Sequence, residues 1–213
     1  MSRIDGNVTE LSPRIGASIQ TLQAAPCWVC QSNLSARAAF CHECGTVQAP
    51  RGLDHFTRMG IDRRFDIERE QLEGRFEAMQ RIFQNERLLA KGPRQKQLAS
   101  DQMSAVTEAY HTLRDPVTRA QYLLSLVDDA GATVLAEANS NDLDVLRGQL
   151  KNATDTAEID RVAFQAGRGV EACIRELSGA FRQQSFAEVA VILARLAQLE
   201  DIAASARDRR SSF

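Results

Sequence analysis

The chain has 213 residues, of which 44% are hydrophobic and 25% are charged, and its formal net charge is −2. This charge offers no electrostatic basis for binding nucleic acid, which requires a basic surface. No apolar run approaches the ~20 residues that cross a membrane. A chain of this length holds one large domain or two or three small ones, and we expect neither a membrane span nor a direct nucleic-acid contact.

Residues 1–26 have the composition of an arm. Glycine and proline interrupt a polar stretch that has only scattered apolar side chains. Such a segment has too little apolar surface to fold by itself. We predict an N-terminal arm that is either disordered or ordered by a partner.

Two cysteine pairs follow within residues 27–50, as Cys27-Trp-Val-Cys30 and Cys41-His-Glu-Cys44. Two residues between cysteines allow one tight turn to direct both sulfurs at one ion, and Gly45 supplies a residue suited to positive φ. Zn²⁺ prefers four tetrahedral ligands, and four thiolates leave no position open for a reacting water. We therefore predict one structural zinc ion held by all four cysteines.

Other interpretations of the cysteines are weaker. Two disulfides would suit a small secreted domain, and a redox CxxC would open a helix after a strand, a pattern missing from this sequence. His42 lies inside the second pair and is an alternative ligand only if one cysteine does not bind. The remaining cysteine, Cys173, falls on an apolar helical face and is expected in the core.

Helical patterns begin after residue 50 and define a domain over residues 51–127. Asp66 is predicted to cap a helix that ends near Phe83, Lys91-Gly92-Pro93 breaks the pattern, and Asp115-Pro116 starts a further short helix. Two antiparallel helices with a short helix on each side make a small bundle. Its expected core includes Leu72, Phe76, Phe83, Val106 and Leu113.

A second helical domain is predicted over residues 140–208. One short helix precedes a long helix that starts near Asp155, and Ser185-Phe-Ala-Glu188 resembles a capping box for the last helix. Three apolar stripes of this kind pack as a three-helix bundle, and the tail at Arg207–Arg210 is expected to fray. The expected core includes Val162, Ile174, Phe181, Ile192 and Leu196.

Several stretches carry a resemblance to a known family. They are Asp54-His-Phe-Thr-Arg-Met-Gly-Ile61, Arg75-Phe-Glu-Ala-Met-Gln-Arg-Ile-Phe83, and Thr107-Glu-Ala-Tyr-His-Thr-Leu-Arg-Asp-Pro116 with the leucine-rich run after it. With the cysteine pairs, this order of parts resembles the eukaryotic, mitochondrial HscB-type J-domain co-chaperones of iron–sulfur cluster assembly. The resemblance implies an all-α fold with a four-cysteine zinc-knuckle module, a four-helix J-like domain and a C-terminal three-helix bundle. It also implies the mitochondrial matrix as location.

One motif of that family is missing. The resemblance implies a His-Pro-Asp loop and a basic helix face that stimulate ATP hydrolysis by a DnaK-type chaperone, but the loop positions here are Gln84, Asn85 and Glu86. The preceding helix mixes glutamates with Arg75 and Arg81 among its arginines, so it is not net basic. We expect the chaperone-binding loop to be degenerate.

The second partner surface of the family is also altered. The resemblance implies that the C-terminal bundle binds the cluster scaffold through apolar and acidic residues on its first helix and an aromatic residue on its last helix. Here Asp142, Leu143 and Leu146 are the candidates on the first helix, and Gln198 stands at the aromatic position.

Two functions follow from these features. The first is a J-like protein that no longer stimulates a chaperone and serves as a structural or adaptor subunit of a larger mitochondrial complex. The second is a divergent co-chaperone that binds a DnaK-type chaperone and an iron–sulfur scaffold. No phosphate loop or catalytic side-chain arrangement is evident, so we do not expect an enzyme.

Overall fold

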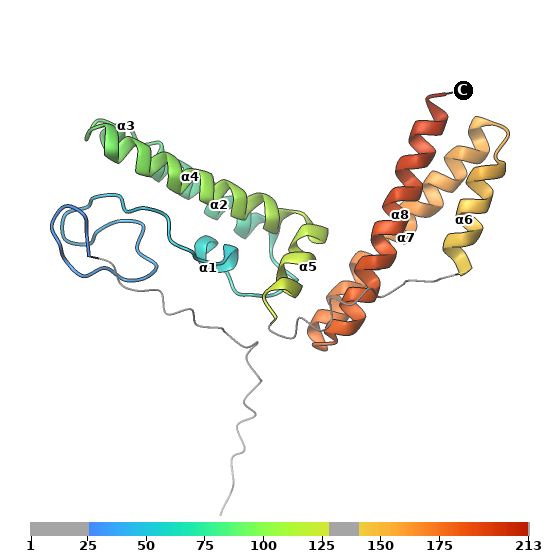
Figure 1. Cartoon of the computed structure of the whole chain (residues 1–213), viewed down its shortest axis with the longest axis horizontal. Helices are drawn as coiled ribbons and strands as arrows, with labels where there is room; N and C mark the ends of the chain where they lie inside the picture. Colours follow the sequence, from blue (N-terminus) through green and yellow to red (C-terminus); the bar gives the residue numbers. More distant parts are fainter. Residues whose placement is uncertain (1–25, 128–140, 213) are drawn as a thin grey trace, which may run out of the picture.

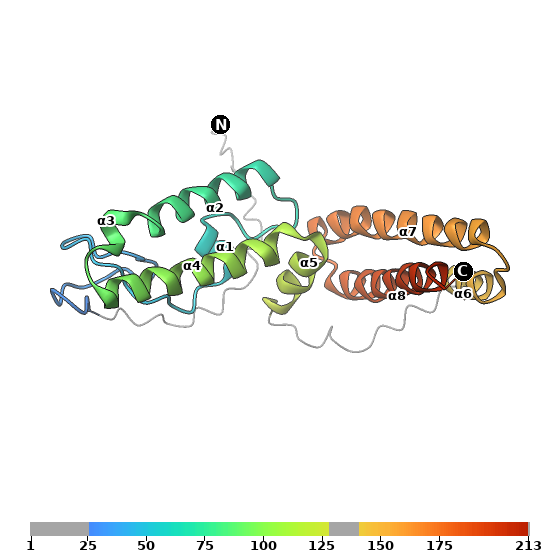
Figure 2. The ribbon, with the colours of Figure 1, turned by 90° about the horizontal axis from the view of Figure 1, so that it is seen from above.

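The computed structural model describes residues 26–127 and 141–212, and these residues form eight helices. Figure 1 shows two parts side by side, the cysteine module with α1–α5 and the bundle α6–α8, and Figure 2 shows that together they make an elongated molecule. The predicted arm, apart from Pro26, and the connection at residues 128–140 lie outside the described residues. No helix in the described part of the chain is long and apolar enough to cross a membrane.

The fold confirms the all-α prediction. The helices are α1 (His55–Met59), α2 (Arg69–Phe83), α3 (Glu86–Leu89), α4 (Pro93–Arg114), α5 (Pro116–Ser125), α6 (Asn141–Asn152), α7 (Thr156–Arg182) and α8 (Phe186–Arg210). Helix α3, a single turn in the loop after α2, was not predicted. Asp115 caps α5 as expected, because its carboxylate accepts hydrogen bonds from the backbone N–H groups of Val117 and Thr118.

The J-like part is built on α2 and α4, which pack against each other with α1 beside them (Figure 1). Leu72, Val106 and Leu113 are buried between these helices, as predicted. Phe76 is only half-buried, and its ring stacks on Tyr110 with centroids 4.2 Å apart. The two rings close the edge of the core, so Phe76 contributes less burial than a central core residue.

The predicted helix cap at Asp66 is wrong. Helix α2 starts three residues later, after Glu68, which makes no side-chain capping bond. The Asp66 carboxylate instead accepts a hydrogen bond of 2.8 Å from the Ser178 hydroxyl and lies 3.9 Å from the Arg182 guanidinium. Asp66 therefore links the J-like part to α7 of the bundle.

The bundle is dominated by the antiparallel pair α7 and α8, with α6 packed against both (Figure 2). Val162, Ile192 and Leu196 are buried as predicted, while Ile174 and Phe181 are partly buried against the same core. The two long helices approach closely at Gly169, where a Cβ atom would lie 2.9 Å from Leu199 Cδ1. Glycine at this position allows the contact.

Two local predictions in the bundle are wrong. The Ser185 side chain does not cap α8. The backbone of Ser185 is instead part of the end of α7, because Gln184 has φ of 56° and the N–H of Ser185 donates to the Ala180 carbonyl. This is the Schellman arrangement for ending a helix. The tail does not fray at Arg207–Arg210 either, since α8 continues to Arg210 and Arg209 donates to three backbone carbonyls near the end of α6.

Candidate functional site

The two cysteine pairs form matching backbone turns. In the first turn the N–H of Gln31 donates to the Cys27 carbonyl, and in the second the N–H of Gly45 donates to the Cys41 carbonyl. Gln31 and Gly45 have φ of 62° and 65°, so both turns end in the left-handed conformation. The predicted role of Gly45 is confirmed, and Gln31 takes the same conformation without the freedom of glycine.

The four cysteine sulfurs come together at one point, as predicted. One ligand atom from each cysteine lies within 4.8 Å of the others, and the Cys27–Cys44 and Cys30–Cys41 Sγ distances are both 3.6 Å. A tetrahedral zinc site with Zn–S bonds of roughly 2.3 Å has sulfur–sulfur edges of about 3.8 Å. These distances fit a shared metal ion, and all four cysteines are free of disulfides.

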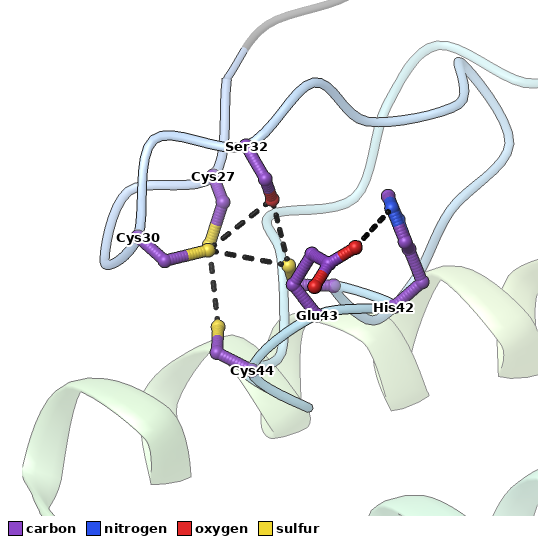
Figure 3. Close-up of polar contacts among 7 residues, drawn as sticks. Cys27, Cys30, Ser32, His42, Glu43 and Cys44 are labelled. Carbon is purple, nitrogen blue, oxygen red and sulfur yellow. Dashed lines mark hydrogen bonds and ion pairs between the residues drawn. The ribbon is translucent and has the colours of Figure 1, made fainter.

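The local electrostatics favour the thiolate form of two of the four cysteines, Cys27 and Cys41. Ser32 Oγ lies 3.2 Å from the Sγ atoms of both Cys30 and Cys41 (Figure 3). The Ser32 hydroxyl, followed by the backbone N–H of Cys44, lowers the pKa of Cys41 to about 6. Burial raises the pKa of Cys27, but backbone N–H groups outweigh it and the net change is downward. Since metals bind the thiolate, the lowered pKa of Cys27 and Cys41 prepares these two cysteines for coordination. The Ser32 hydroxyl also lowers the pKa of Cys30, but burial and the neighbouring Cys44 and Cys41 thiols outweigh it, and the net change is upward.

His42 is not one of the clustered ligands. Its Nε2 atom lies 3.3 Å from the Glu43 carboxylate, and both side chains are about two-thirds exposed, at 65% and 64%. Figure 3 shows this pair beside the sulfur cluster. The cluster is thus made of cysteine alone in the described part of the chain.

The cysteine module is fixed to α4 by buried amide side chains that the sequence did not single out. Gln95 Oε1 accepts a hydrogen bond of 3.2 Å from the Val47 N–H, and Gln102 Nε2 donates to the Gln48 carbonyl at 2.9 Å. The Arg94 guanidinium lies 4.0 Å from the centre of the Trp28 ring, a cation–π contact at the start of the same helix. These contacts make the module part of the J-like domain rather than a separate appendage.

The same module supports the loop in which the His-Pro-Asp motif is missing. Phe40 stacks on Phe83, the last residue of α2, with ring centroids 5.4 Å apart. Directly after Phe83, Gln84 ends α2 and Asn85 caps α3 by accepting a hydrogen bond from the Arg87 N–H. Gln84, Asn85 and Glu86 are all exposed, so this corner of the fold is held in place and faces solvent.

The surface of α2 carries balanced charge. Its residues include three arginines and three glutamates, and the Arg69 guanidinium pairs with Glu73 at 2.8 Å. Arg75 lies against the end of α1, where a Cβ atom on Gly60 would be 3.5 Å from its Nη1 atom. Arg81 remains exposed in the last turn of α2. This helix therefore presents no concentrated positive surface.

The bundle surface differs from the predicted one. Leu143 and Leu146 are 1% and 9% exposed, because both face the bundle core. They are therefore unavailable as an apolar patch, and Val145, which is 50% exposed, is the apolar side chain that α6 presents.

The polar members of that surface are held across α6 and α8. Asp142 pairs with Arg195 at 2.6 Å, and the Gln198 amide oxygen accepts a hydrogen bond of 2.9 Å from Arg147. Neither arginine was predicted, since nothing in the local sequence marks Arg195 as a partner of α6 or Arg147 as a partner of α8.

Comparisons with known proteins agree with this architecture. No protein-family model matches the chain. It is 39% identical over 74 residues to the co-chaperone protein HscB of Proteus mirabilis. The matched residues cover 35% of this chain and 43% of that protein. It is 25% identical over 183 residues to the iron–sulfur cluster co-chaperone protein HscB homolog of Arabidopsis thaliana, which covers 83% of this chain and 71% of that protein.

The fold is similar to that of a solved structure. The crystal structure of human co-chaperone protein HscB matches this fold with a TM-score of 0.75 at 22% identity. The match covers 88% of this chain and 100% of the human one. The fold and the site thus define an all-helical protein with a four-cysteine module docked on its N-terminal helices and a C-terminal three-helix bundle. In sequence and fold, this chain is similar to the HscB-type co-chaperones.

Proposed function

We propose that this protein is an HscB-like J-domain protein that does not stimulate a DnaK-type chaperone and acts as an adaptor between other proteins, rather than as an enzyme. The observation that carries the proposal is a retained fold with altered loop chemistry. The corner after α2 is fully built, with Phe83 buried beneath it, yet it presents Gln84, Asn85 and Glu86 to solvent.

The charge on α2 supports the same proposal. A helix with three arginines and three glutamates gives little electrostatic attraction to an acidic chaperone surface. Two of the arginines also have intramolecular neighbours, Arg69 at Glu73 and Arg75 at Gly60. The altered loop thus follows a helix that has no excess of positive charge.

A single-turnover ATPase assay tests the proposal. The full chain is added to an ATP-loaded DnaK-type chaperone from the same source, and the expected result is hydrolysis at the basal rate. A clear increase in rate that disappears in Glu86→Ala would refute the adaptor function, because it would assign chemistry to the altered loop. The exposed Glu77→Ala on α2 is the matched control for loss of one carboxylate.

Restoring the motif separates the loop from the helix surface. Asn85 has φ of −66°, which proline accepts, but Gln84 at φ −95° and ψ 10° would have to become more extended before a proline. The triple variant Gln84→His, Asn85→Pro, Glu86→Asp therefore requires a small local change. Regained stimulation would show that only the loop was lost, and continued basal hydrolysis would show that the α2 surface has changed as well.

A second candidate function is a divergent co-chaperone of iron–sulfur cluster assembly. Both relatives are named as co-chaperones, and the Arabidopsis thaliana relative is named as an iron–sulfur cluster co-chaperone. In that case the chain binds a DnaK-type chaperone and a cluster scaffold. Purification from the native source distinguishes the two: a stoichiometric larger complex supports the adaptor, and a chaperone with a scaffold supports the co-chaperone. For either function we propose the mitochondrial matrix as location, and subcellular fractionation tests it.

We also propose that the four cysteines hold one structural Zn²⁺. The all-cysteine ligand set and the 3.6 Å sulfur distances support it. Elemental analysis should find one zinc per chain, and Cys41→Ser should release it while α6–α8 stay folded. An iron absorption spectrum, or a disulfide detected by mass spectrometry, would contradict this assignment.

A further inference from the structure

A cavity lies at the joint between the J-like part and the bundle. Its volume is about 300 Å³, roughly ten times the ~30 Å³ that a water molecule occupies in the liquid. Its walls come from three separated parts of the chain: Phe65 before α2, Leu123 on α5, and Phe181 with Phe186 at the turn between α7 and α8. Phe65 and Phe181 stack with centroids 5.2 Å apart, which fixes one wall.

The rim of this cavity is positively charged. Arg63, Arg64 and Arg182 line it together with a single carboxylate, Asp66. Arg63 is engaged by Asp54 at 2.9 Å, and Arg182 lies 3.9 Å from Asp66. Arg64 is exposed and forms no ion pair with any other residue that the structure describes. One cation at the mouth of an apolar cavity is therefore available to an incoming anion.

Apolar walls and a cationic rim define the chemistry of a ligand. Small-molecule sites are concave, mainly apolar, commonly placed between domains, and carry a few polar groups that orient the ligand. A guanidinium binds a carboxylate through two parallel hydrogen bonds. An uncharged apolar molecule would not use Arg64, and a small inorganic anion would not use the aromatic walls.

We propose that this cavity binds one medium-chain fatty acid, with the alkyl chain against Phe65, Phe181 and Phe186 and the carboxylate at Arg64. The site is separate from both the cysteine cluster and the loop after α2. It is formed only when the J-like part and the bundle are in contact, so its occupancy would favour the joined arrangement seen here.

Calorimetric titration of the full chain with monomeric decanoate tests the proposal. Saturable binding at one site is expected, with affinity increasing about fourfold for each methylene from octanoate to decanoate as apolar surface is buried. Arg64→Glu should weaken decanoate binding by about tenfold or more, as expected for loss of a charge-assisted contact, and leave binding of decanol unchanged. Arg168→Glu, an exposed arginine of α7 about 21 Å along the helix from Arg182, is the matched control and should change neither.

Three results would overturn the proposal. They are the absence of saturable decanoate binding, equal affinity for decanoate and decanol, and equal effects of Arg64→Glu and Arg168→Glu. Circular dichroism checks that both variants remain folded. Amide NMR signals provide a second measurement, because decanoate should shift those of Phe65, Phe181 and Phe186, and shifts confined to other residues would place the ligand elsewhere.

Discussion

Replacing Gln102 by leucine tests whether α4 holds the cysteine module in place. Gln102 is 4% exposed, and its amide donates to the Gln48 carbonyl at 2.9 Å. Leucine has a similar size but no donor, so the buried carbonyl would lose its partner. An unsatisfied buried group of this kind costs about 1–3 kcal/mol. A cost of about 2 kcal/mol, the middle of that range, corresponds to a fall in Tm of roughly 4–8 °C for a chain of this size.

The assay is urea unfolding of the zinc-loaded chain, followed by far-UV circular dichroism and tryptophan fluorescence. Trp28 reports on the module because its indole N–H donates to the Val47 carbonyl at 2.9 Å. Gln97→Leu is the matched control, since Gln97 lies on the same helix and is exposed. The control should change the free energy of unfolding by no more than about 0.5 kcal/mol.

A double-mutant cycle with Cys41→Ser makes the reasoning refutable. Once the module has lost its metal and unfolded, Gln48 is hydrated and Gln102→Leu should have almost no further cost. An equal cost in both backgrounds would show that Gln102 stabilises α4 by some route other than holding the cysteine module in place.

Three further predictions concern other parts of the fold. Arg209→Gln should destabilise the bundle by about 1.5–3 kcal/mol in thermal unfolding, because Arg209 donates to the carbonyls of Leu150, Lys151 and Ala153. Arg207→Gln on the exposed face should have little effect. An equal loss of stability in both variants would contradict the role of Arg209 in holding the end of α6. Gln184→Gly should stabilise the bundle by about 0.5–1 kcal/mol, since φ of 56° is strained for glutamine, and a lower Tm would be the opposing result. Burial raises the pKa of Asp54, but hydrogen bonds from Arg63 and Thr57 outweigh it and bring the pKa below 3.8; its stabilising effect is therefore present above pH 3.8 and is lost as the pH falls below that value. Urea unfolding at about pH 5 and pH 3 should show a smaller drop in stability for Asp54→Asn than for the unchanged chain, and equal drops would assign the acid sensitivity to other carboxylates.

The sequence by itself determined the features whose physical cause is local. Apolar residues three and four positions apart must share one face of a helix, so α2, α4, α7 and α8 could be placed before their partners were known. Each cysteine pair needs only one tight turn to aim two sulfurs at one point, and a connection of ten residues, 31–40, is short enough to bring the second pair back to the first. The altered tripeptide was equally visible, because it depends on residue identity alone.

The tertiary structure alone decided which distant groups meet. Asp66 had the pattern of a helix cap, but it bonds to Ser178, 112 residues away, and Gln95 meets Val47 across 48 residues. Leu143 had been expected at a partner surface and is instead buried, because α6 packs on α7 and α8 and turns that side of the helix inward. The spacing of polar and apolar residues predicts which side of a helix is exposed and which is buried. The partners of each side chain depend instead on how whole helices are placed. That placement is set by the summed burial of many residues, so no single residue predicts it.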